Sequence, residues 1–353
     1  MRITELSVPG YERVAKAEDP ESGLRAIIAV HDRTLGPALG GMRMWPYAKE
    51  EDAVFDVLRL SRGMTYKSAV GRTGLGGGKS VLMGDSKKDK CERLFRAMGR
   101  FIEAFGGAYI TAEDVGTTVP DLVTVRQETR WVSGLPREMG SSGNPSPYTA
   151  RGVYLGMRAV FEERFGVSSA KGLHVAIQGI GSVGTSLAQL LAQAGAKLTI
   201  ADVNEARAQA LAKELGAAVC SADAVMGVEC DVLSPCALGA GINDSTIPAL
   251  RCKAIAGAAN NQLLEPRHGD ALRAKNILYA PDYVINAGGI INVGCEFLPG
   301  GYKEEESLKR IDRIYENLKE VFAVSKRDGV GTHVAADRRA EEILDETRRA
   351  KRK

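Results

Sequence analysis

The chain has 353 residues, of which 44% are hydrophobic and 26% are charged. This length suits two domains of roughly 150 residues each, and this balance is that of a globular protein, which excludes an unstructured chain. The 47 Lys and Arg residues barely outnumber the 44 Asp and Glu residues, and much of the excess lies in residues 348–353. That distribution favours a solvated helix end over a surface for nucleic acid.

The sequence carries no signal for a membrane or for an oxidising compartment. No apolar run approaches the roughly 18 residues of a membrane span, and residues 1–10 show no cationic stretch followed by an apolar one. The six cysteines form no CxxC pair, which argues against a metal site and favours reduced thiols. We therefore expect a cytoplasmic protein without a bound metal or a membrane partner.

The first part of the chain mixes two kinds of pattern. Residues 25–31 and 80–83 have the composition of strands, whereas residues 50–63 and 89–105 have helical periodicity. We predict an α/β domain over residues 1–134.

A loop rich in Gly, Ser, Asn and Pro at residues 140–147 precedes a predicted helix at 148–165. From His174 onward, β-rich runs alternate with helical stretches; the runs are HVAIQG, KLTIAD, AAVC, CDVLSPCA, AIAGAANN and ILYAPDYVINAGG. Such alternation is typical of a parallel sheet with helices on both faces, so we predict a Rossmann-type domain over residues 135–329, separated from the first by a cleft.

Two charged helices, near residues 304–325 and 335–351, end the chain. The C-terminal segment 330–353 is expected to pack back on the first domain.

A glycine-rich turn follows the first strand of the second domain. It contains Gly179, Gly181, Ser182, Val183 and Gly184 and opens a helical stretch. The first glycine permits the tight turn, the second lets a pyrophosphate approach the backbone, and the third allows close packing of helix on strand. The turn predicts a dinucleotide site.

The next predicted strand ends at Asp202. A carboxylate there can bind the ribose hydroxyls of adenosine and repel a 2′-phosphate, which favours NAD over NADP. Arg207 lies close by in the sequence and leaves strict NAD preference open.

In the first domain, three glycines precede Lys79. The segment resembles a phosphate loop, but that pattern requires glycine where this chain has Thr73, and a strand follows. We expect the glycines to leave room for a small substrate beside the amine. Burial and a second cation, offered by Lys67, would favour neutral Lys79, which could then act as a general base.

Spacing alone leaves these assignments open. Either lysine fits a surface charge, and Asp114, which follows a β-rich run, fits a helix cap as well as a group facing a cleft. No metal motif and no GxSxG nucleophile motif accompanies them.

Several segments together carry a resemblance to a known family. They are LGPALGGMRMWPY, LSRGMTYKSA, GGGKSV, YITAEDVGTTV, GSSGNPSP, GAANNQL and APDYVINAGGIINV. With these motifs the chain resembles the glutamate, leucine, phenylalanine and valine dehydrogenase family over nearly its whole length, and most closely the members that oxidise leucine.

The resemblance implies roles for individual residues. Lys67 would hold the substrate carboxylate, Lys79 would be the general base, and Asp114 would shuttle protons, with the backbone of Gly40 and Gly41 beside the substrate. Hydride would pass from the substrate Cα to NAD, and water activated by Lys79 would convert the iminium ion to a 2-oxo acid and ammonia. The first domain would thus bind substrate and mediate assembly into a homo-oligomer.

Further residues would line the two halves of the site by the same resemblance. The NAD side would comprise the glycine turn together with Thr149, Asp202, Val203, Cys236, Ala237, Ala258, Asn260 and Asn286. The substrate side would comprise Asn261 and an uncharged side-chain pocket of Leu39, Met64, Ala112, Ile290 and Val293.

The uncharged pocket bears on the substrate. Glutamate-specific members carry a lysine before the two glycines, where this chain has Leu39, so a glutamate carboxylate would be desolvated without a partner. We expect leucine, isoleucine and valine as substrates, with leucine preferred. Phenylalanine stays an alternative that Ile290 and Val293 disfavour, while Met42 and Arg72 leave fine specificity open.

Two other classes of function remain possible on the sequence. One is a non-catalytic NAD-binding sensor, against which Lys67, Lys79 and Asp114 argue because a sensor needs none of them. The other is an enzyme of the same fold that acts on a hydroxy acid or a carbon–carbon double bond, which would release no ammonia.

Overall fold

The structure is a computed structural model, and it describes residues 1–237 and 239–352. The chain divides into two compact units. Unit 1 comprises Met1–Asn144, Val293–Glu304 and the C-terminal residues from Glu341, and unit 2 comprises Pro145–Asn292 and Glu305–Ala340.

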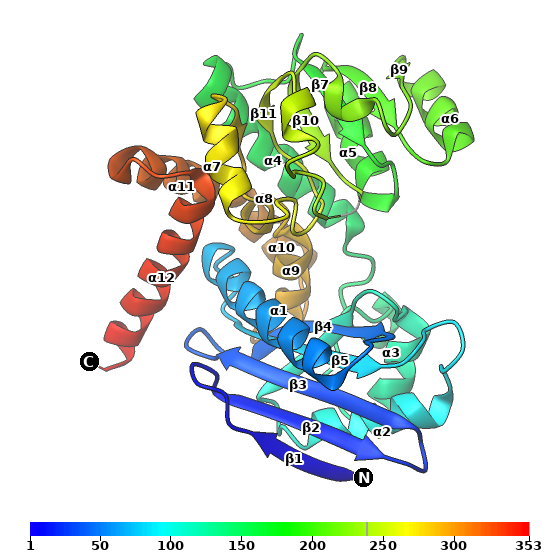
Figure 1. Cartoon of the computed structure of the whole chain (residues 1–353). Coiled ribbons are helices and arrows are strands. Elements are labelled where there is room, and N and C mark those ends of the chain that lie inside the picture. Colours follow the sequence, from blue (N-terminus) through cyan, green and yellow to red (C-terminus); the bar gives the residue numbers. More distant parts are fainter. Residues whose placement is uncertain (238, 353) are drawn as a thin grey trace. The chain divides into compact units, whose positions relative to one another are not determined.

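Unit 1 is built on a six-stranded mixed sheet with the strand order β1-β2-β3-β5-β4-β6 (Figure 1). Its strands are β1 (Arg2–Leu6), β2 (Arg13–Asp19), β3 (Leu24–Asp32), β4 (Ala38–Trp45), β5 (Gly76–Met83) and β6 (Tyr109–Glu113). Its helices in the first part of the chain are α1 (Glu50–Val70), α2 (Glu92–Glu103) and α3 (Val119–Arg126). The strands β5, β4 and β6 run parallel to one another, whereas β1, β2 and β3 pair antiparallel.

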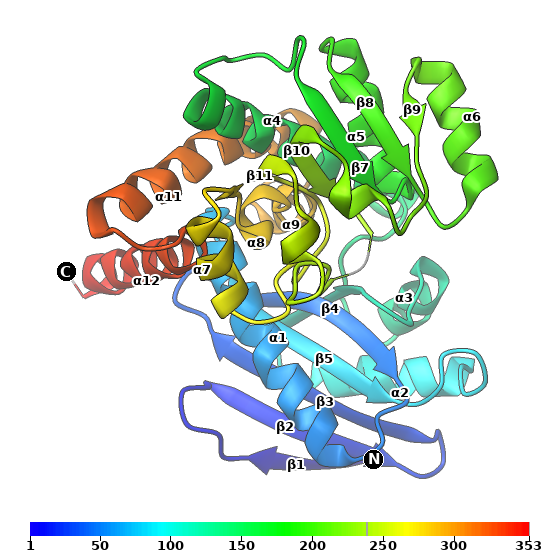
Figure 2. The same ribbon diagram turned by 45° about the horizontal axis from the view of Figure 1, so that its top comes forward.

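Helices cover both faces of this sheet (Figures 1 and 2). On one face, Ala53 and Val57 of α1 pack with Ile27 and Val81. On the other, α2 contributes Phe101 and further apolar residues to a larger core that includes Ile28 and Met42 of the sheet. Because successive side chains of a strand point to opposite faces, alternate residues of β4 and β5 face α1, and the residues between them face α2.

Unit 2 contains a second sheet of six strands, all parallel, in the order β12-β11-β10-β7-β8-β9. Its strands are β7 (His174–Gln178), β8 (Lys197–Ala201), β9 (Ala218–Val219), β10 (Cys230–Pro235), β11 (Cys252–Ile255) and β12 (Leu278–Tyr279). The helices that follow Asn144 are α4 (Ser146–Phe165), α5 (Ser182–Gln193), α6 (Glu205–Leu215), α7 (Arg267–Ala274), α8 (Asp282–Ile285), α9 (Gly288–Gly294), α10 (Glu304–Asp312), α11 (Ile314–Asp328) and α12 (Thr332–Lys351).

The parallel order of unit 2 confirms the prediction of an α/β fold with a Rossmann-type sheet. Helix α5 contacts β7 and β8, and α4 packs on α5 and contacts β11. Leu272 of α7 belongs to a core cluster with Leu233 and Ile255 of the sheet. The central strands β7 and β10 are thus buried between helical layers, as their apolar runs require, whereas both residues of the edge strand β9 are exposed.

Three predicted elements differ from the structure. α1 continues past Gly63 to Val70, because its last turns are buried against the sheet and Gly63 faces open space. The predicted helix at 304–325 is divided into α10 and α11 at Arg313. In the run that begins at Ile277, only Leu278–Tyr279 is strand, and the rest turns into α8 and α9.

The unit boundaries also differ from the predicted domain boundaries. The predicted limit at residues 134 and 135 lies before the loop that ends at Asn144, and this loop belongs to unit 1. Glu296 explains the difference, since its carboxylate accepts hydrogen bonds from the backbone N–H of Gly134 (3.1 Å) and of Ser142 (2.9 Å). The C-terminal helix α12 is shared, because residues up to Ala340 belong to unit 2 and those from Glu341 to unit 1.

The end of α12 is joined to unit 1 by polar contacts. Tyr66 of α1 donates its hydroxyl hydrogen to Glu341 Oε1 over 2.7 Å. Arg348 Nη2 pairs with Asp32 Oδ2 over 2.5 Å. Exposed ion pairs add little free energy, so we attribute the docking of this segment mainly to buried Ile343 and Leu344.

The tight packing of α1 on β5 leads to a prediction about stability. A Cβ atom added at Gly77 would lie 2.1 Å from Thr65 N of α1. We expect Gly77→Ala to lower the free energy of unfolding by about 1–3 kcal/mol, because the helix must move away from the strand. Thermal unfolding followed by circular dichroism measures this. The matched control is Gly63→Ala, which adds a Cβ in open space within α1 and should raise the melting temperature slightly. Equal effects of the two substitutions would contradict the packing argument.

Candidate functional site

The predicted substrate residues of unit 1 lie on neighbouring parallel strands. In the sheet register, Leu39 pairs with Gly77 and Gly41 pairs with Ala112. Val81 packs against α1, so Lys79, two residues earlier on β5, lies on the same α1 side of the sheet. The sheet therefore gathers residues from β4, β5 and β6 on one face.

Lys79 and Asp114 form a direct ion pair. Lys79 Nζ lies 2.7 Å from Asp114 Oδ2, and only 7% of the Lys79 side chain and 21% of the Asp114 side chain are exposed. Asp114 comes directly after β6, in a turn where its N–H donates to Thr117 Oγ1 and that hydroxyl donates to the carbonyl oxygen of Met42 (2.8 Å). The turn thereby holds the carboxylate at the end of its strand. Asp114 is not the cap of α3, since Thr118 occupies that position.

A third charged residue, Arg43, was missed by the sequence analysis. Its Nε donates to Asp114 Oδ2 over 3.1 Å. Burial by itself would raise the pKa of Asp114, but the charges of Lys79 and Arg43 outweigh it, and the pKa lies below its ordinary value. Arg43 stands two residues after Gly41 on a strand, so the alternation of side chains would have placed it on the same face.

The glycines around the pair are required by the protein's own packing. A Cβ atom at Gly40 would lie 1.7 Å from the carbonyl oxygen of Gly78, and one at Gly41 would lie 2.7 Å from Asp114 Cβ. The same holds for the glycines before Lys79, since Thr65 fills the space at Gly77 and the Tyr109 ring fills the space at Gly78. The expectation that these glycines leave room for a substrate is therefore wrong. They also lie within β5, not before it.

Most residues of the predicted side-chain pocket belong to unit 1. Leu39 is buried, with 2% of its surface exposed, and Ala112 lies beside Gly41 in the register. Met64 and Lys67 lie in the last turns of α1, the helix whose Thr65 packs on Gly77. Val293 is buried in unit 1.

Three more residues from the specificity analysis lie elsewhere. Ile290 is buried in unit 2. Met42 belongs to the core on the α2 side of the sheet, which is the face opposite to Lys79. Its side chain is therefore not part of the substrate face. Arg72 follows α1 with a φ of 49°, in the left-handed region.

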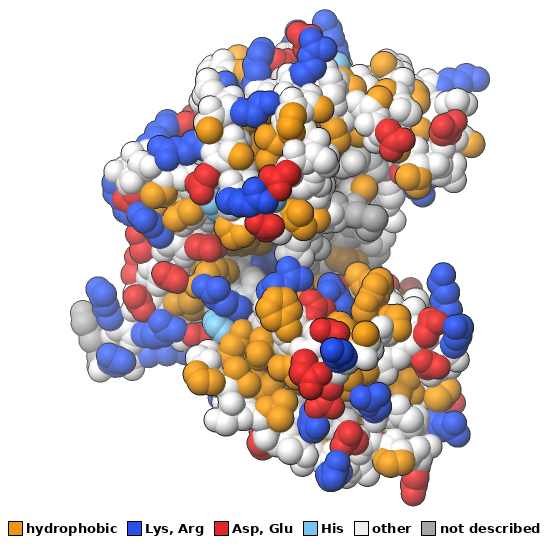
Figure 3. Space-filling model, viewed as in Figure 1, with side chains coloured by type: hydrophobic (Ala, Val, Ile, Leu, Met, Phe, Trp, Pro, Cys, Tyr) orange, Lys and Arg blue, Asp and Glu red, His pale blue; other side chains and the backbone are white. Residues whose placement is uncertain are grey.

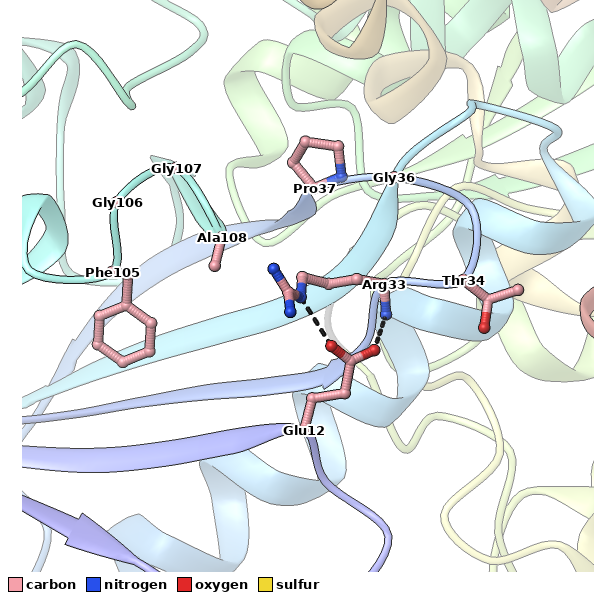
Figure 4. Close-up of a pocket in the computed structure, with 9 residues that line it drawn as sticks. All are labelled: Glu12, Arg33, Thr34, Gly36, Pro37, Phe105, Gly106, Gly107 and Ala108. Carbon is pink, nitrogen blue, oxygen red and sulfur yellow. Dashed lines mark hydrogen bonds and ion pairs between the residues drawn. The ribbon is translucent and has the colours of Figure 1, made fainter. Parts of the chain in front are cut away.

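A hollow of about 510 Å³ lies at the other end of β4 and β6, where Gly36, Pro37 and Ala108 line it (Figure 4). Its charged groups are Glu12 and Arg33, and they pair with each other, with Arg33 Nε 2.7 Å from Glu12 Oε2. The hollow offers a balanced charge and is separate from the Lys79–Asp114 pair, so we assign it no role in catalysis.

The glycine turn of unit 2 has the geometry that its sequence predicts. Gly179 has a φ of +89° and follows β7. A Cβ atom at Gly184 would lie 2.1 Å from the carbonyl oxygen of Gly179, whereas one at Gly181 would meet no heavy atom within 4 Å. Gly181 precedes α5, so the turn leaves open space at a helix N-terminus, where a pyrophosphate fits.

Asp202 lies at the end of β8 beside this turn. Its Oδ2 accepts from the N–H of Ile180 (2.8 Å), and its Oδ1 accepts from the N–H of Asn204 (2.8 Å). Arg207 Nη2 is 2.9 Å from both oxygens. Burial alone would raise the pKa of Asp202, but these hydrogen bonds and the Arg207 charge lower it. Asp202 is thus ionised and already paired with a cation, while the neighbouring Val203 is 90% exposed.

The other predicted cofactor residues form two groups within unit 2. Cys236 and Ala237 follow β10 and lie against the glycine turn, since a Cβ at Gly179 would be 2.7 Å from Ala237 Cβ. Asn286 Nδ2 donates to Asn260 Oδ1 (2.7 Å) and to the Ala258 carbonyl oxygen (3.1 Å).

The side-chain oxygen of Asn286 has no hydrogen-bond donor among the described residues. This Oδ1 is buried, so it could accept a hydrogen bond from a ligand. Asn261, next to Asn260, has a φ of 51° and is exposed. Thr149 lies beside Gly289, whose added Cβ would be 2.7 Å from Thr149 Oγ1.

Within residues 1–237 and 239–352, no group of three or more His, Cys, Asp or Glu side chains is placed to hold a metal ion. No helix there combines the length and the hydropathy needed to cross a membrane.

Comparison with known proteins gives matches over nearly the whole chain. The family model for the Glu/Leu/Phe/Val dehydrogenase dimerisation domain matches residues 11–131, and the model for Glutamate/Leucine/Phenylalanine/Valine dehydrogenase matches residues 140–348. The leucine dehydrogenase of Geobacillus stearothermophilus is 55% identical over 97% of this chain and 92% of its own length. The phenylalanine dehydrogenase of Lysinibacillus sphaericus is 44% identical over 96% of this chain and 90% of its own.

Among solved structures, the L-tryptophan dehydrogenase from Nostoc punctiforme is similar, with a TM-score of 0.86 and 42% identity over 96% of this chain and 97% of that one. The folds agree across the full length, and the sequence matches cover both units. The chain therefore belongs to the glutamate, leucine, phenylalanine and valine dehydrogenase family and is an amino acid dehydrogenase, an oxidoreductase that acts on the CH–NH2 group of its substrate.

Proposed function

We propose that the protein is an NAD-dependent leucine dehydrogenase that converts branched-chain L-amino acids to 2-oxo acids and ammonia. The observation that carries the proposal is the buried Lys79–Asp114 pair, 2.7 Å apart, on the substrate face of unit 1. A non-catalytic sensor would have no use for such a pair, which is costly to desolvate. Leucine dehydrogenases share 52–55% identity with this chain and the phenylalanine dehydrogenase of Lysinibacillus sphaericus shares 44%, which supports leucine over phenylalanine.

Each charged residue has a task in the proposed reaction. Lys67 binds the substrate carboxylate. Bound NAD would accept a hydride from the substrate Cα. Lys79 must be neutral for the next step, so Nζ first gives up the proton of its ion pair. Nζ then takes a proton from the water whose oxygen bonds to that carbon, and the bond from carbon to nitrogen breaks as the new hydroxyl group gives its own proton to Nζ and becomes the carbonyl group. Asp114 passes protons between Lys79 and the departing amine, for which its contact with Nζ is short enough.

The side-chain pocket explains the choice of substrate. Leu39 and Ala112 offer only apolar atoms beside Gly41, and Val293 of the same unit is proposed to complete the pocket. A carboxylate bound there would lose its hydration without a partner, which disfavours glutamate. Differences of one methylene are worth about 1–3 kcal/mol, so isoleucine and valine should also react.

We propose NAD as the cofactor because Asp202 is ionised at the end of β8. The glycine turn would hold the pyrophosphate at Gly181, and Asn260 and Asn286 would face the other end of the dinucleotide together with Thr149, Cys236 and Ala237. Arg207 competes with the ribose for Asp202, since its guanidinium donates to both carboxylate oxygens.

A prediction follows for the adenosine ribose. In Arg207→Ala, the Asp202 carboxylate keeps its two backbone hydrogen bonds but loses its cation, so its remaining lone pairs can accept from the ribose hydroxyls and the Arg207 charge no longer attracts a 2′-phosphate. We therefore expect tighter binding of NADH and weaker binding of NADPH, with the ratio of the two dissociation constants changing roughly tenfold. Titration followed by nicotinamide fluorescence measures both constants. If NADPH binding does not weaken in the variant, Arg207 has no part in the choice of cofactor.

We further propose that the protein is a homo-oligomer assembled through unit 1. The family model that matches residues 11–131 is that of a dimerisation domain. Large apolar side chains of this unit are also exposed, with Phe55 68% and Trp45 51% accessible. Hydrophobic side chains gather over the part of Figure 3 that contains unit 1. Such a patch suits contact with another protein surface, and sedimentation velocity would measure the assembly.

The test of the proposed function is the reduction of NAD, followed by NADH absorbance, with leucine, isoleucine, valine, phenylalanine and glutamate. We expect the highest kcat/KM with leucine and no reaction with glutamate. A preference for phenylalanine would keep the chemistry and reject the assigned pocket. No reduction with any amino acid would reject the function.

A further inference from the structure

Arg43 joins the proton-shuttle residue to a second carboxylate. On one side its Nε donates to Asp114 Oδ2 over 3.1 Å, and on the other its Nη1 donates to Asp56 Oδ2 over 2.9 Å. Only 20% of the Arg43 side chain is exposed. A guanidinium that serves two carboxylates at once has one rotamer that satisfies both, so it fixes their separation.

The far end of this bridge is itself anchored. Asp56 lies on α1 with 16% of its side chain exposed, and Tyr47 donates its hydroxyl hydrogen to the same Oδ2 over 2.7 Å. Arg59 reaches the other oxygen of Asp56 at 3.3 Å from the surface. Arg43 is therefore held from the side remote from the reaction and has little freedom to leave Asp114.

Asp114, at the other end of the Arg43 bridge, is also closely packed. A Cβ at Gly41 would lie 2.7 Å from Asp114 Cβ, so the backbone of β4 packs directly against one side of the Asp114 side chain. Lys79 Nζ and Arg43 Nε both approach the same oxygen, Oδ2. Without Arg43, the side chain of Asp114 would keep one charged partner and could rotate about Cα–Cβ away from the place where it meets Lys79.

We propose that Arg43 is a positioning residue of the reaction, which holds Asp114 Oδ2 against Lys79 Nζ through its second contact with Asp56. The inference rests on the proposed function, because it assigns Asp114 the proton shuttle. Arg43 acts through Asp114 and needs no contact with the substrate.

The charges around Asp114 add a second effect. Ionisable groups on the surrounding elements include Lys79 of β5, Arg43 of β4, Tyr47 just beyond it, Asp56, Arg59 and Lys67 of α1, Tyr109 and Glu113 of β6, and Asp121 of α3. Burial would raise the pKa of Asp114, and the charges of Lys79 and Arg43 lower it. Loss of Arg43 therefore raises the pKa of Asp114, and the shuttle is protonated over a wider range of acidic pH.

The experiment compares kcat for leucine oxidation as a function of pH in four variants of the full-length protein. We expect Arg43→Gln to lower kcat about tenfold or more and to move the acidic limb of the profile to higher pH, because loss of a cation favours the protonated form of the groups that pass the proton. Arg43→Lys keeps the charge but cannot reach both carboxylates, so kcat falls while the limb stays near its wild-type position. Asp56→Asn removes a negative charge, so its limb moves in the opposite direction, to lower pH.

The matched control is Arg59→Gln, which removes a neighbouring cation that pairs with Asp56 but does not contact Asp114. It should have the wild-type kcat and profile. A profile of Arg43→Gln identical to that of Arg59→Gln would overturn the proposal, and so would limbs of Arg43→Gln and Asp56→Asn that move the same way. If Arg43→Gln fails to fold, a wild-type kcat in Arg43→Lys overturns it equally.

Failure of the proposed function would look different. In that case the wild-type protein itself does not oxidise leucine, or Asp114→Asn keeps the wild-type kcat. The Arg43 comparison is then made with whichever amino acid the wild-type protein oxidises, so the positioning role is tested in either event.

Discussion

The Lys79→Ala variant is expected to lose leucine oxidation, with kcat at least about 10³-fold lower, because no other amine takes the place of the general base. NADH binding should be unchanged, since the glycine turn and Asp202 belong to unit 2. Initial rates of NADH formation and a fluorescence titration with NADH measure the two quantities on the same preparation.

A suitable control for Lys79→Ala is Lys16→Ala. Lys16 Nζ forms an ion pair of the same length, 2.7 Å, with Glu50 at the start of α1, but it has no role in the proposed reaction. This variant should keep its activity. Loss of NADH binding in Lys79→Ala would contradict the assignment of substrate and cofactor to different units, and full activity would reject Lys79 as the base.

The Asp114→Asn variant is expected to lose activity and stability together. The amide cannot accept a proton from Lys79, so kcat should fall by about 10²- to 10⁴-fold. The substitution also leaves Lys79 and Arg43 without their shared counter-charge. Breaking a fully buried pair costs about 3–5 kcal/mol. With 21% of the Asp114 side chain exposed, we expect about 1–3 kcal/mol.

The pH dependence of this stability effect has a definite sign. The pKa of Asp114 in the folded protein lies below its ordinary value, so the ionised carboxylate stabilises the fold at neutral pH. That contribution is lost as the pH falls through the folded-state pKa. The difference in melting temperature between the wild-type protein and Asp114→Asn should therefore be large at pH 7 and narrow below about pH 4. A constant difference across this range would contradict the ionic origin of the effect.

The sequence was sufficient for the parts of the fold that depend on local patterns. The Rossmann-type sheet of unit 2 follows from alternating runs. The turn after β7 follows from its glycines, of which Gly179 has a positive φ that other residues adopt only with strain. The predicted strand at 25–31 covers nearly all of β3, and the one at 80–83 is the last half of β5, since most of their residues are buried on both faces.

The remainder depended on tertiary contacts that a local pattern does not contain. Glycines at 76–78 are poor strand formers, yet they lie in β5. The close approach of Asp32 to Gly76, of Thr65 to Gly77 and of Tyr109 to Gly78 explains why no larger residue stands there. Gly63 suggested the end of a helix, but burial of the following turns on the sheet carries α1 to Val70.

The same limit applied to the site. Lys79 and Asp114 were found through the family resemblance, since their spacing alone also fits surface charge and a helix cap. The contact of Arg43 with Asp114 joins residues 71 positions apart, and only the pairing of β4 with β6 brings them together.

The most direct test of oxidative deamination is the stoichiometry of one complete reaction with limiting L-leucine and excess NAD. We predict that NADH, ammonia and the 2-oxo acid of leucine appear in equal amounts, each equal to the leucine consumed. Formation of NADH without ammonia would contradict the account, because it would leave Lys79 and Asp114 with no amine to release.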